Sequence, residues 1–236
     1  MLNFLGRGSA FTKNHNCAFF IDEHDFVMLD CPMSAVQKII DFKWSSFSNE
    51  NVVNHFYILV THTHSDHVGG IGMLVHYAYY VLGMPVTIFA SSEELKSDIE
   101  ILLKLDGCDP NGYNIVLSID KKWFVRSIST THTKILEGKC FGFQLYINRK
   151  NIIFTGDTNT LKPFDQYLVK DSILYTESAF YSSEAHLILD KHLNELIDYT
   201  NSDIDVNIMH IDNLDGVSEL IKNTKIKIVP LYNEGV

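Results

Sequence analysis

The alternation of apolar and polar residues divides the chain into short strands and amphipathic helices. Short apolar runs between turn residues are typical of strands, whereas apolar residues at helical spacing indicate a helix. Val36, Ile39 and Ile40 have this helical spacing, and SSEEL at 91–95 has the polar residues with which helices begin. The predicted strands are 2–5, 17–21, 26–30, 56–60, 86–90, 113–118, 123–131, 140–147, 151–155, 173–176, 206–210 and 226–229, and the predicted helices are 33–43, 71–82, 91–105, 190–200 and 214–222.

Both halves of the chain are predicted to have the same organisation, in which runs of strands are interrupted by helices. This order fits an α/β sandwich of two mixed β-sheets with helices on both outer faces. The sequence has no internal repeat, low-complexity tract or linker rich in proline and glycine. We therefore expect residues 1–236 to form a single domain, which is an ordinary domain length.

The charge balance argues against a polyanionic partner. The chain has 19 Lys and Arg against 29 Asp and Glu, a formal net charge of −10. Contacts along a phosphate backbone need clustered cations, and the sequence shows no such cluster. Binding of a large nucleic acid is therefore not expected, although a metal site can still attract one small phosphate.

Cysteine usage and hydropathy point to a cytoplasmic protein without a membrane segment. The four cysteines, at positions 17, 31, 108 and 140, form no CxxC pair. Their spacing suggests neither a disulfide framework nor a thiolate zinc site, so we expect reduced structural thiols. The opening MLNFLGRGSAF has no long apolar run, and no segment approaches the roughly 20 apolar residues that cross a bilayer.

A cluster of metal-ligating residues follows the predicted buried strand at 56–60. The segment HTHSDH at 62–67 supplies three imidazoles and one carboxylate within six residues. Borderline cations such as Zn²⁺ favour this mixture of nitrogen and oxygen ligands. The segment lies between a buried strand and Gly69-Gly70, which distinguishes it from a histidine-rich surface loop.

The motif resembles the hallmark HxHxDH of the metallo-β-lactamase superfamily. Further residues at predicted strand ends match the superfamily in order: Asp30, His132, Asp157 in TGDT, and His210. The resemblance implies two divalent metal ions, with Zn²⁺ expected and Mn²⁺ as the alternative. It implies that His62, His64 and His132 hold the first ion, that Asp66, His67 and His210 hold the second, and that Asp157 and a hydroxide bridge them. Asp30 is expected to orient a ligand histidine.

Within the superfamily, the chain resembles the phosphodiesterase branch that contains ribonuclease Z. Motifs that look like those of the branch are present at Gly6 and Gly8, at Asn16 and in the segment Thr176–Phe180. The resemblance implies that Glu177 is a catalytic residue, and Thr176 stands in place of a proton-transferring histidine. The short interval from His132 to Asp157 leaves no room for a tRNA-binding arm. The chain is therefore similar to small cyclic phosphodiesterases, such as the viral anti-Pycsar enzymes that hydrolyse cyclic nucleotides.

The same resemblance suggests a general acid near the metals. Small members of the branch have a His-Leu-Ser/Asn segment before a helix, and the expected match is His192-Leu193-Asn194. Asn194 would cap that helix, and His192 would protonate the leaving oxygen. His186 is the alternative for this role. Asp66 and Glu177 complete the expected catalytic residues.

The predicted helix at 71–82 is apolar on nearly every face. Met73, Tyr77 and Tyr80 are expected to be exposed, and an apolar patch of this kind usually marks a partner surface. The branch commonly pairs through this helix, so we expect a homodimer with two-fold symmetry.

Residues and resemblance together predict a dinuclear metal-dependent phosphodiesterase for small phosphodiesters, with 3′,5′-cyclic nucleotides favoured and a metal-bridging hydroxide as nucleophile. Three alternatives stay open. They are a ribonuclease Z-like RNA endonuclease, a lactonase or thioesterase of the same fold, and a non-catalytic binding module.

Overall fold

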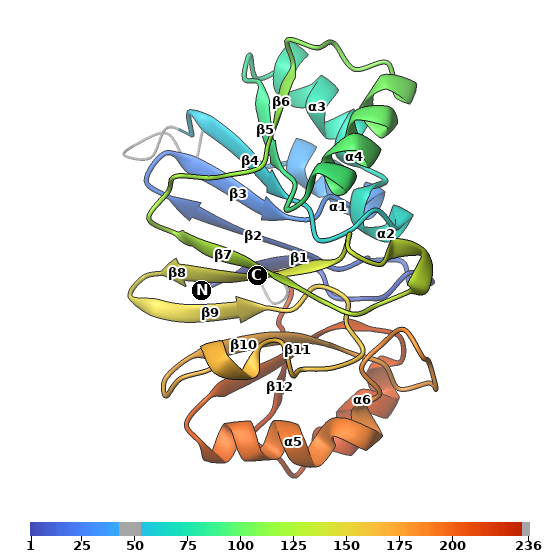
Figure 1. Ribbon diagram of the computed structural model, residues 1–236, viewed down its shortest axis with the longest axis vertical. Helices are drawn as coiled ribbons and strands as arrows, with labels where there is room; N and C mark the ends of the chain where they lie inside the picture. The colour runs from blue at the N-terminus through green and yellow to red at the C-terminus, as the bar shows by residue number, and fades with distance from the viewer. Residues whose placement is uncertain (43–52, 233–236) are drawn as a thin grey trace. The chain divides into compact units, whose positions relative to one another are not determined.

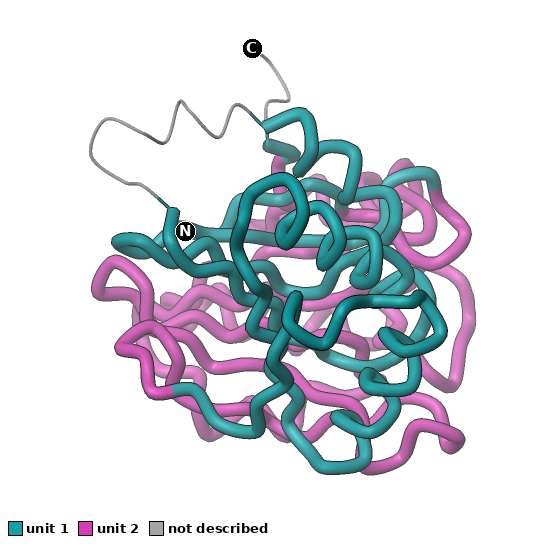
Figure 2. The backbone as a smooth tube through the Cα atoms, turned by 90° about the horizontal axis from the view of Figure 1, so that it is seen from above, with its two compact units in different colours: residues 1–6, 13–119, 231–236 teal, residues 7–12, 120–230 magenta. Residues whose placement is uncertain are grey.

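The computed structural model describes residues 1–42 and 53–232, and the chain divides into two compact units (Figures 1 and 2). Unit 1 comprises residues 1–6, 13–119 and 231–236, and unit 2 comprises residues 7–12 and 120–230. Each unit contains one six-stranded sheet. The single domain expected over 1–236 stays a prediction.

The sheet of unit 1 has its six strands side by side in chain order. The first two pairings, β1–β2 and β2–β3, are antiparallel, and the remaining three are parallel. Every residue of β3 is buried, as is common for strands of a sheet covered on both faces. The strands are β1 Asn3–Gly6, β2 Cys17–Asp22, β3 Asp25–Leu29, β4 His55–Leu59, β5 Val86–Phe89 and β6 Tyr113–Val116, and the helices are α1 Met33–Ile40, α2 Ser65–Val68, α3 Ile71–Tyr80 and α4 Glu93–Leu105.

The sheet of unit 2 repeats this plan with six further strands in chain order. Its first two pairings, β7–β8 and β8–β9, are antiparallel, and the other three are parallel. The strands are β7 Phe124–Ser129, β8 Phe141–Ile147, β9 Lys150–Phe154, β10 Ile173–Ser178, β11 Asp205–Ile211 and β12 Lys227–Ile228, the helices are α5 Leu189–Asn201 and α6 Leu214–Ile221, and short 3₁₀ turns lie at Lys134–Leu136 and Asp165–Tyr167.

The core of unit 2 forms where helices α5 and α6 cover the parallel strands (Figure 1). Leu189 and Leu196 of α5 and Val217 of α6 are fully buried together with Leu174 and Val206 of the sheet. Burial of such a side chain stabilises the fold by about 1.5–3 kcal/mol. This packing holds β10 and β11 in place, and their carboxyl ends carry the candidate site residues Glu177 and His210.

Three strand ends of the two sheets turn through the left-handed region of backbone conformation. Asp30 follows β3 with φ 61°, Gly156 follows β9 with φ 60°, and His210 near the end of β11 has φ 51°. Aspartate and histidine adopt this conformation more readily than most residues. At His210 the register of β10 and β11 also shifts, because Glu177 pairs with Met209 but Ser178 pairs with Ile211. The left-handed positions are thus two candidate site residues, Asp30 and His210, and the glycine directly before Asp157.

Most of the predicted elements are confirmed, with shifts at their ends. The predicted helix 33–43 ends at Ile40, and position 43 lies outside the described residues. The predicted strand 226–229 shortens to Lys227–Ile228. Helix α2, Ser65–Val68, was not expected, because the HTHSDH segment was interpreted only as a ligand cluster that follows a buried strand. A four-residue helix has too few positions to show an apolar periodicity.

Two expectations about the whole sequence can be compared with the described residues. The cysteines at positions 17, 31, 108 and 140 are all free thiols and buried, as expected. Burial raises the pKa of the Cys108 thiol to about 11. Among the described helices, none has the length and apolar character that a bilayer crossing requires.

Helix α3 has one buried face and one exposed apolar face. Its buried residues include Ile71, Leu74 and Ala78. Met73 and Tyr80 are 51% and 66% exposed, as expected. The expectation for Tyr77 was wrong, because this side chain is half-buried and its hydroxyl donates to the Ile40 carbonyl at 3.5 Å.

Each unit contains segments from near both ends of the chain. In unit 1, the Tyr232 N–H donates to the Phe4 carbonyl at 2.7 Å, beside a bridge between Phe4 and Leu231. In unit 2, the Arg7 guanidinium donates to the Val229 carbonyl at 2.9 Å. Residues 7–12 thus belong to unit 2, although β1 just before them belongs to unit 1.

Candidate metal site

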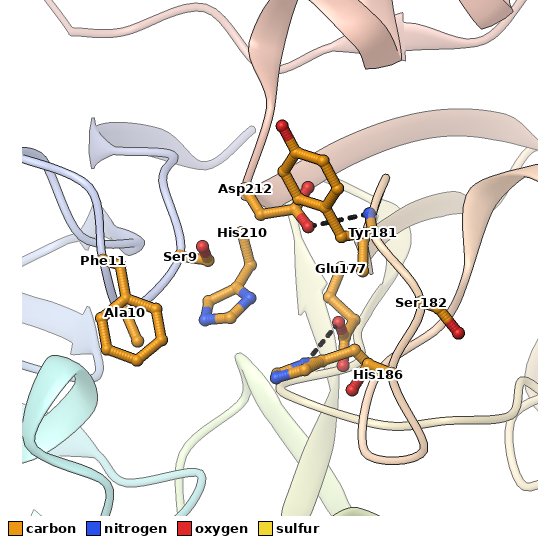
Figure 3. Close-up of a pocket in the computed structure, with 11 residues that line it drawn as sticks. Ser9, Ala10, Phe11, Glu177, Tyr181, Ser182, His186, His210 and Asp212 are labelled. Atoms are coloured by element: carbon orange, nitrogen blue, oxygen red, sulfur yellow. Dashed lines mark hydrogen bonds and ion pairs between the residues drawn. The ribbon is translucent and has the colours of Figure 1, made fainter.

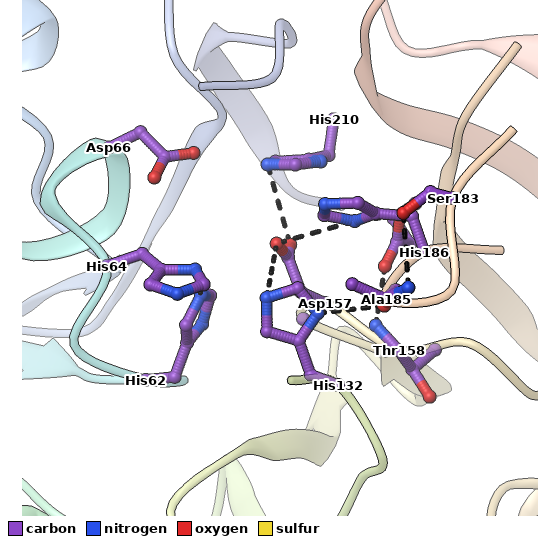
Figure 4. A network of polar contacts seen from close by, with 12 residues as sticks. His62, His64, Asp66, His132, Asp157, Thr158, Ser183, Ala185, His186 and His210 are labelled. Atoms are coloured by element: carbon purple, nitrogen blue, oxygen red, sulfur yellow. Dashed lines mark hydrogen bonds and ion pairs between the residues drawn. The ribbon is translucent and has the colours of Figure 1, made fainter. Parts of the chain in front are cut away.

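Unit 1 carries four of the seven predicted metal ligands, at the end of β4 and in helix α2. His62, Asp66 and His67 are buried, and His64 is half-buried. The His62 Nε2 and His64 Nδ1 atoms are 3.0 Å apart (Figure 4). Two ligands of one zinc ion, each about 2.0–2.2 Å from it, are separated by roughly 3.0–3.5 Å. The spacing of the two imidazole nitrogens therefore fits a shared ion.

The Asp30 carboxylate fixes the orientation of these histidines from inside unit 1. It is fully buried, and its Oδ2 accepts from His67 Nδ1 and from the Thr61 hydroxyl, each at 2.8 Å. Its Oδ1 accepts from the Thr61 N–H at 2.8 Å. Because a carboxylate only accepts, the His67 proton is on Nδ1, and Nε2 is left to bind a metal.

The same carboxylate acts on His62 through Thr61. The Thr61 hydroxyl donates its hydrogen to Asp30, so its oxygen accepts from His62 Nδ1 at 3.0 Å. This bond places the His62 proton on Nδ1, and the Nε2 beside His64 is left unprotonated. One buried carboxylate thus sets the tautomers of two predicted ligands.

Unit 2 carries the other three predicted ligands around the carboxylate of Asp157 (Figure 4). His210 Nε2 is 3.5 Å from Asp157 Oδ1, and His132 Nε2 is 3.8 Å from Asp157 Oδ2. His186 Nδ1 also lies 3.7 Å from Asp157 Oδ2. These distances are longer than ordinary hydrogen bonds. They are close to the separation of two ligands that share one metal ion.

Hydrogen bonds to the far side of each ring orient the unit 2 imidazoles. His132 Nδ1 donates to the Ala185 carbonyl at 2.8 Å, so its Nε2 is the atom that can bind a metal. His186 Nδ1 donates to Glu177 Oε2 at 2.8 Å. Ligand atoms of His132, Asp157, Glu177 and His186 lie within 4.8 Å of one another. The donor set therefore fits a divalent metal, although Glu177 and His186 were not among the ligands predicted from the sequence.

Glu177 is a fully buried carboxylate at the carboxyl end of β10. Its Oε1 accepts from the Thr158 N–H at 2.5 Å, while its Oε2 accepts from His186. Burial, and next the adjacent Asp157 carboxylate, raise the pKa of Glu177, while the bond to His186 opposes this shift. Glu177 is therefore placed to orient the His186 ring.

The helix-capping expectation for Asn194 was wrong. Helix α5 begins at Leu189 with Ile188 in the capping position, so Asn194 lies inside the helix. His192 also lies inside it, and its Nδ1 donates to Glu195 Oε2 at 2.7 Å. Among the described residues, His192 is not a member of any group with metal-ligand spacing. The His-Leu pair that precedes the helix is His186-Leu187, which the repeated His-Leu pattern of the sequence concealed.

A cavity of about 250 Å³ opens beside the unit 2 ligands (Figure 3). His186, His210 and Glu177 line it, together with the aromatic residues Phe11 and Tyr181. Sequence reasoning missed both aromatic residues as site residues. Phe11 falls in the glycine-containing segment near the amino terminus, and Tyr181 directly follows the segment that contains Glu177. Nothing in their spacing indicated that the two segments line one cavity.

Two family models match parts of the chain. A family model described as the metallo-beta-lactamase superfamily matches residues 56–191, which is more than half of the chain. A second model, described as anti-Pycsar protein Apyc1, matches residues 1–108. The chain therefore belongs to the metallo-β-lactamase superfamily, and its two mixed β-sheets with helices confirm the expected fold class. Membership supports the expected metal-dependent hydrolase.

Individual relatives add detail. The chain is 25% identical over 221 residues to anti-Pycsar protein Apyc1 of Bacillus phage BSP38, a match that covers 82% of each chain. It superimposes with a TM-score of 0.70 on the metallo-beta-lactamase fold protein YhfI from Bacillus subtilis, at 14% identity, covering 100% of this chain and 96% of that one. It superimposes with a TM-score of 0.65 on human tRNase Z, short form, at 15% identity, covering 91% and 93%. At these identities the likeness to the two solved structures shows the fold alone.

The hydrogen bonds of Asp30 lead to a test of its orienting role. Asparagine tolerates the φ of 61° at this position, but its amide group donates where the carboxylate accepts. In Asp30→Asn, the His67 proton should move to Nε2, and Zn²⁺ affinity should fall by roughly 10–100-fold. Competition with a chromophoric chelator measures this affinity. The exposed Asp41→Asn in unit 1 is the matched control, and equal affinities in both variants would refute the orienting role.

Proposed function

We propose that the protein is a dinuclear metal-dependent phosphodiesterase that hydrolyses small phosphodiesters, with 3′,5′-cyclic nucleotides as its favoured substrates. The observation that carries this proposal is the pairing of His186 with the buried Glu177 at the wall of the cavity, beside His210. A positioned imidazole next to metal ligands suits the departure of an unactivated alkoxide, such as a ribose oxygen. The resemblance to anti-Pycsar enzymes supports the same substrate class.

The seven predicted ligands would hold two divalent ions, an assignment that rests on the family pattern. The ions are Zn²⁺ or Mn²⁺, and when bound they neutralise phosphate charge and lower the pKa of a bound water. The chain itself orients the imidazoles of His62 and His67 through Asp30. It orients His132 through the Ala185 carbonyl.

His186 would act as the general acid in place of His192. Its Nδ1–H is committed to Glu177, so Nε2 is the atom that can carry a proton to the leaving oxygen. The Glu177 carboxylate fixes the tautomer and the orientation of the ring, as a buried carboxylate does for the histidine of a catalytic triad. His192 is bonded to Glu195 on helix α5 and is not among the residues that line the cavity.

The size of the cavity and the charge of the chain favour a small substrate. A volume of about 250 Å³ lies just below the range of typical ligand pockets, which measure roughly 300–1,000 Å³. The net charge of −10 opposes the many phosphate contacts that a folded tRNA needs. These features make cyclic nucleotides a better substrate than precursor tRNA.

Metal content is the first test of this proposal. Purified protein reconstituted with Zn²⁺ or Mn²⁺ should hold close to two ions per chain by elemental analysis. Asp66→Ala and Asp157→Ala should each abolish hydrolysis, because each removes a predicted metal ligand. Circular dichroism should show that both variants stay folded. Finding no metal after reconstitution would rule out the central claim.

Leaving-group dependence tests the role of His186. His186→Ala should slow hydrolysis of 3′,5′-cyclic AMP by roughly 10²–10⁴-fold, the usual contribution of a positioned acid. It should affect an activated nitrophenyl phosphodiester much less, because nitrophenolate leaves without a proton. Steady-state kinetics on both substrates measure the difference.

His192→Ala is the matched control for this comparison, since it removes an imidazole that is also bonded to a carboxylate but lies within helix α5. It should retain wild-type turnover of both substrates. A selective loss in His192→Ala would return the acid role to His192, and equal losses on both substrates in His186→Ala would indicate a metal ligand instead. Efficient cleavage of precursor tRNA without any turnover of cyclic nucleotides would overturn the substrate assignment.

We also propose that the protein forms a homodimer through the exposed face of helix α3. Met73, Tyr80 and the adjacent Val81 are 51%, 66% and 65% exposed. Grouped apolar side chains of this kind are typical of partner surfaces. Light scattering at micromolar concentration should give the mass of two chains for the wild type and of one chain for Met73→Glu. Ile135→Glu, at an exposed apolar position of unit 2, is the control and should stay dimeric. A monomeric wild type would contradict the proposal.

A further inference from the structure

The cavity of unit 2 has a polar end and an aromatic rim. His186, His210 and Glu177 lie at the polar end, whereas Phe11 and Tyr181 belong to the rim. Figure 3 shows the Phe11 ring on one side of the His210 imidazole and the Tyr181 ring on the other. A ligand with its phosphate at the histidines would therefore have its remaining part beside aromatic rings.

The turn that carries Phe11 is held firmly on unit 2. The Ser9 N–H donates to the Ile211 carbonyl at 3.0 Å, and the Ile211 N–H donates to the Arg7 carbonyl at 2.8 Å. The Thr12 hydroxyl and N–H both donate to the Ser9 carbonyl, at 2.8 and 3.1 Å. Yet the Phe11 side chain is fully exposed, with a relative exposure of 103%. The backbone thus fixes an aromatic ring in solvent at the edge of the cavity.

Tyr181 is fixed at the opposite side of the rim. Its hydroxyl accepts from the Asn213 amide at 3.1 Å, and its N–H donates to Asp212 Oδ2 at 3.1 Å. The neighbouring Phe180 packs against Gly216 of α6, where a Cβ atom would come within 2.5 Å of its ring. Phe180 meets Tyr181 edge to face, with ring centroids 5.4 Å apart. Phe180 therefore supports Tyr181, whose ring is 60% exposed.

The rim carboxylate, Asp212, already accepts hydrogen bonds from the backbone. Asp212 Oδ1 accepts from the Phe180 N–H at 2.8 Å, and Oδ2 accepts from the Tyr181 N–H. The other polar rim side chains are serine hydroxyls at positions 9, 182 and 183, and a hydroxyl both donates and accepts. Flat aromatic faces, rather than charged groups, are thus the main means of recognition that the rim offers.

We propose that Phe11 is a stacking platform for the nucleobase of the substrate, and that Tyr181 confines the base from the other side of the rim. The proposal rests on the proposed function, which places the phosphate at the metal ligands. Stacking of a base on an aromatic side chain contributes about 1–3 kcal/mol in nucleic-acid-binding proteins. Phe11 would therefore act on substrate affinity as a positioning residue, without a part in proton transfer.

Kinetics on substrates with and without a base test the platform. Phe11→Ala should raise KM for 3′,5′-cyclic AMP by roughly 5–150-fold, the equivalent of the stacking contribution, while kcat changes far less. The loss should be much smaller on methyl p-nitrophenyl phosphate, which has no base. Phe11→Trp should restore the KM for cyclic AMP, because it restores an aromatic face, whereas Phe11→Leu should not. Tyr146→Ala, at a half-exposed position on β8, is the matched control and should keep the wild-type KM.

A binding measurement separates this proposal from the enzymatic one. Saturation-transfer NMR with adenosine 5′-monophosphate should show transfer to the adenine ring protons in the wild type and in Tyr146→Ala, and a marked loss in Phe11→Ala. Absence of cyclic-nucleotide hydrolysis with this NMR pattern intact would refute the proposed function but support the platform. Equal signals in the wild type and Phe11→Ala, or no adenine signal in the wild type, would overturn the platform.

Discussion

The burial of the Asp157 carboxylate is the constraint on which the unit 2 site depends. A buried carboxylate is costly unless cationic or hydrogen-bonding groups surround it. Imidazoles of His132, His186 and His210 provide those surroundings at 3.5–3.8 Å. The Asp157 carbonyl also accepts from the Thr130 hydroxyl at 3.0 Å, which holds the backbone of the turn. A bound cation would complete the compensation, so the same arrangement that tolerates the charge also suits it to metal binding.

The repeated sheet plan explains why both units present ligands. In each sheet the third strand is the first of the parallel set, and its end carries a buried aspartate, Asp30 after β3 and Asp157 after β9. In unit 1 the next strand, β4, leads to His62. In unit 2 the next strand, β10, ends with Glu177 and Ser178. Carboxyl ends of parallel strands lie at one edge of a sheet, where ligand sites commonly form. Equivalent positions in the plan thus place an aspartate beside imidazoles, but on different sides of the rings. Asp30 engages Nδ1 of His67 directly and Nδ1 of His62 through Thr61, whereas Asp157 lies near Nε2 of His132 and His210.

The sequence predicted the parts of this protein that depend on local patterns. Apolar runs located every strand, and the order of His62, Asp157 and His210 at strand ends revealed the family. The candidate for a general acid was harder to choose from the sequence, because His186 and His192 each precede a leucine and only the start of α5 at Leu189 separates them. Residues brought in by distant contacts were not predictable. Phe11 reaches the cavity only because its turn pairs with Ile211, two hundred positions later.

That long-range pairing also constrains how the chain can fold during synthesis. The hydrogen bond between Arg7 and Val229 spans 222 positions. The bridge between Phe4 of β1 and Leu231 joins residues that are similarly far apart in the sequence. Closing so large a loop costs entropy before any contact is gained, and topologies rich in such contacts fold slowly. A nascent chain therefore has neither unit complete until residues 229–232 have been synthesised. Until then the edge of β1 is open to non-native strand pairing, and chaperones that shield strand edges should have their largest effect on yield in this interval.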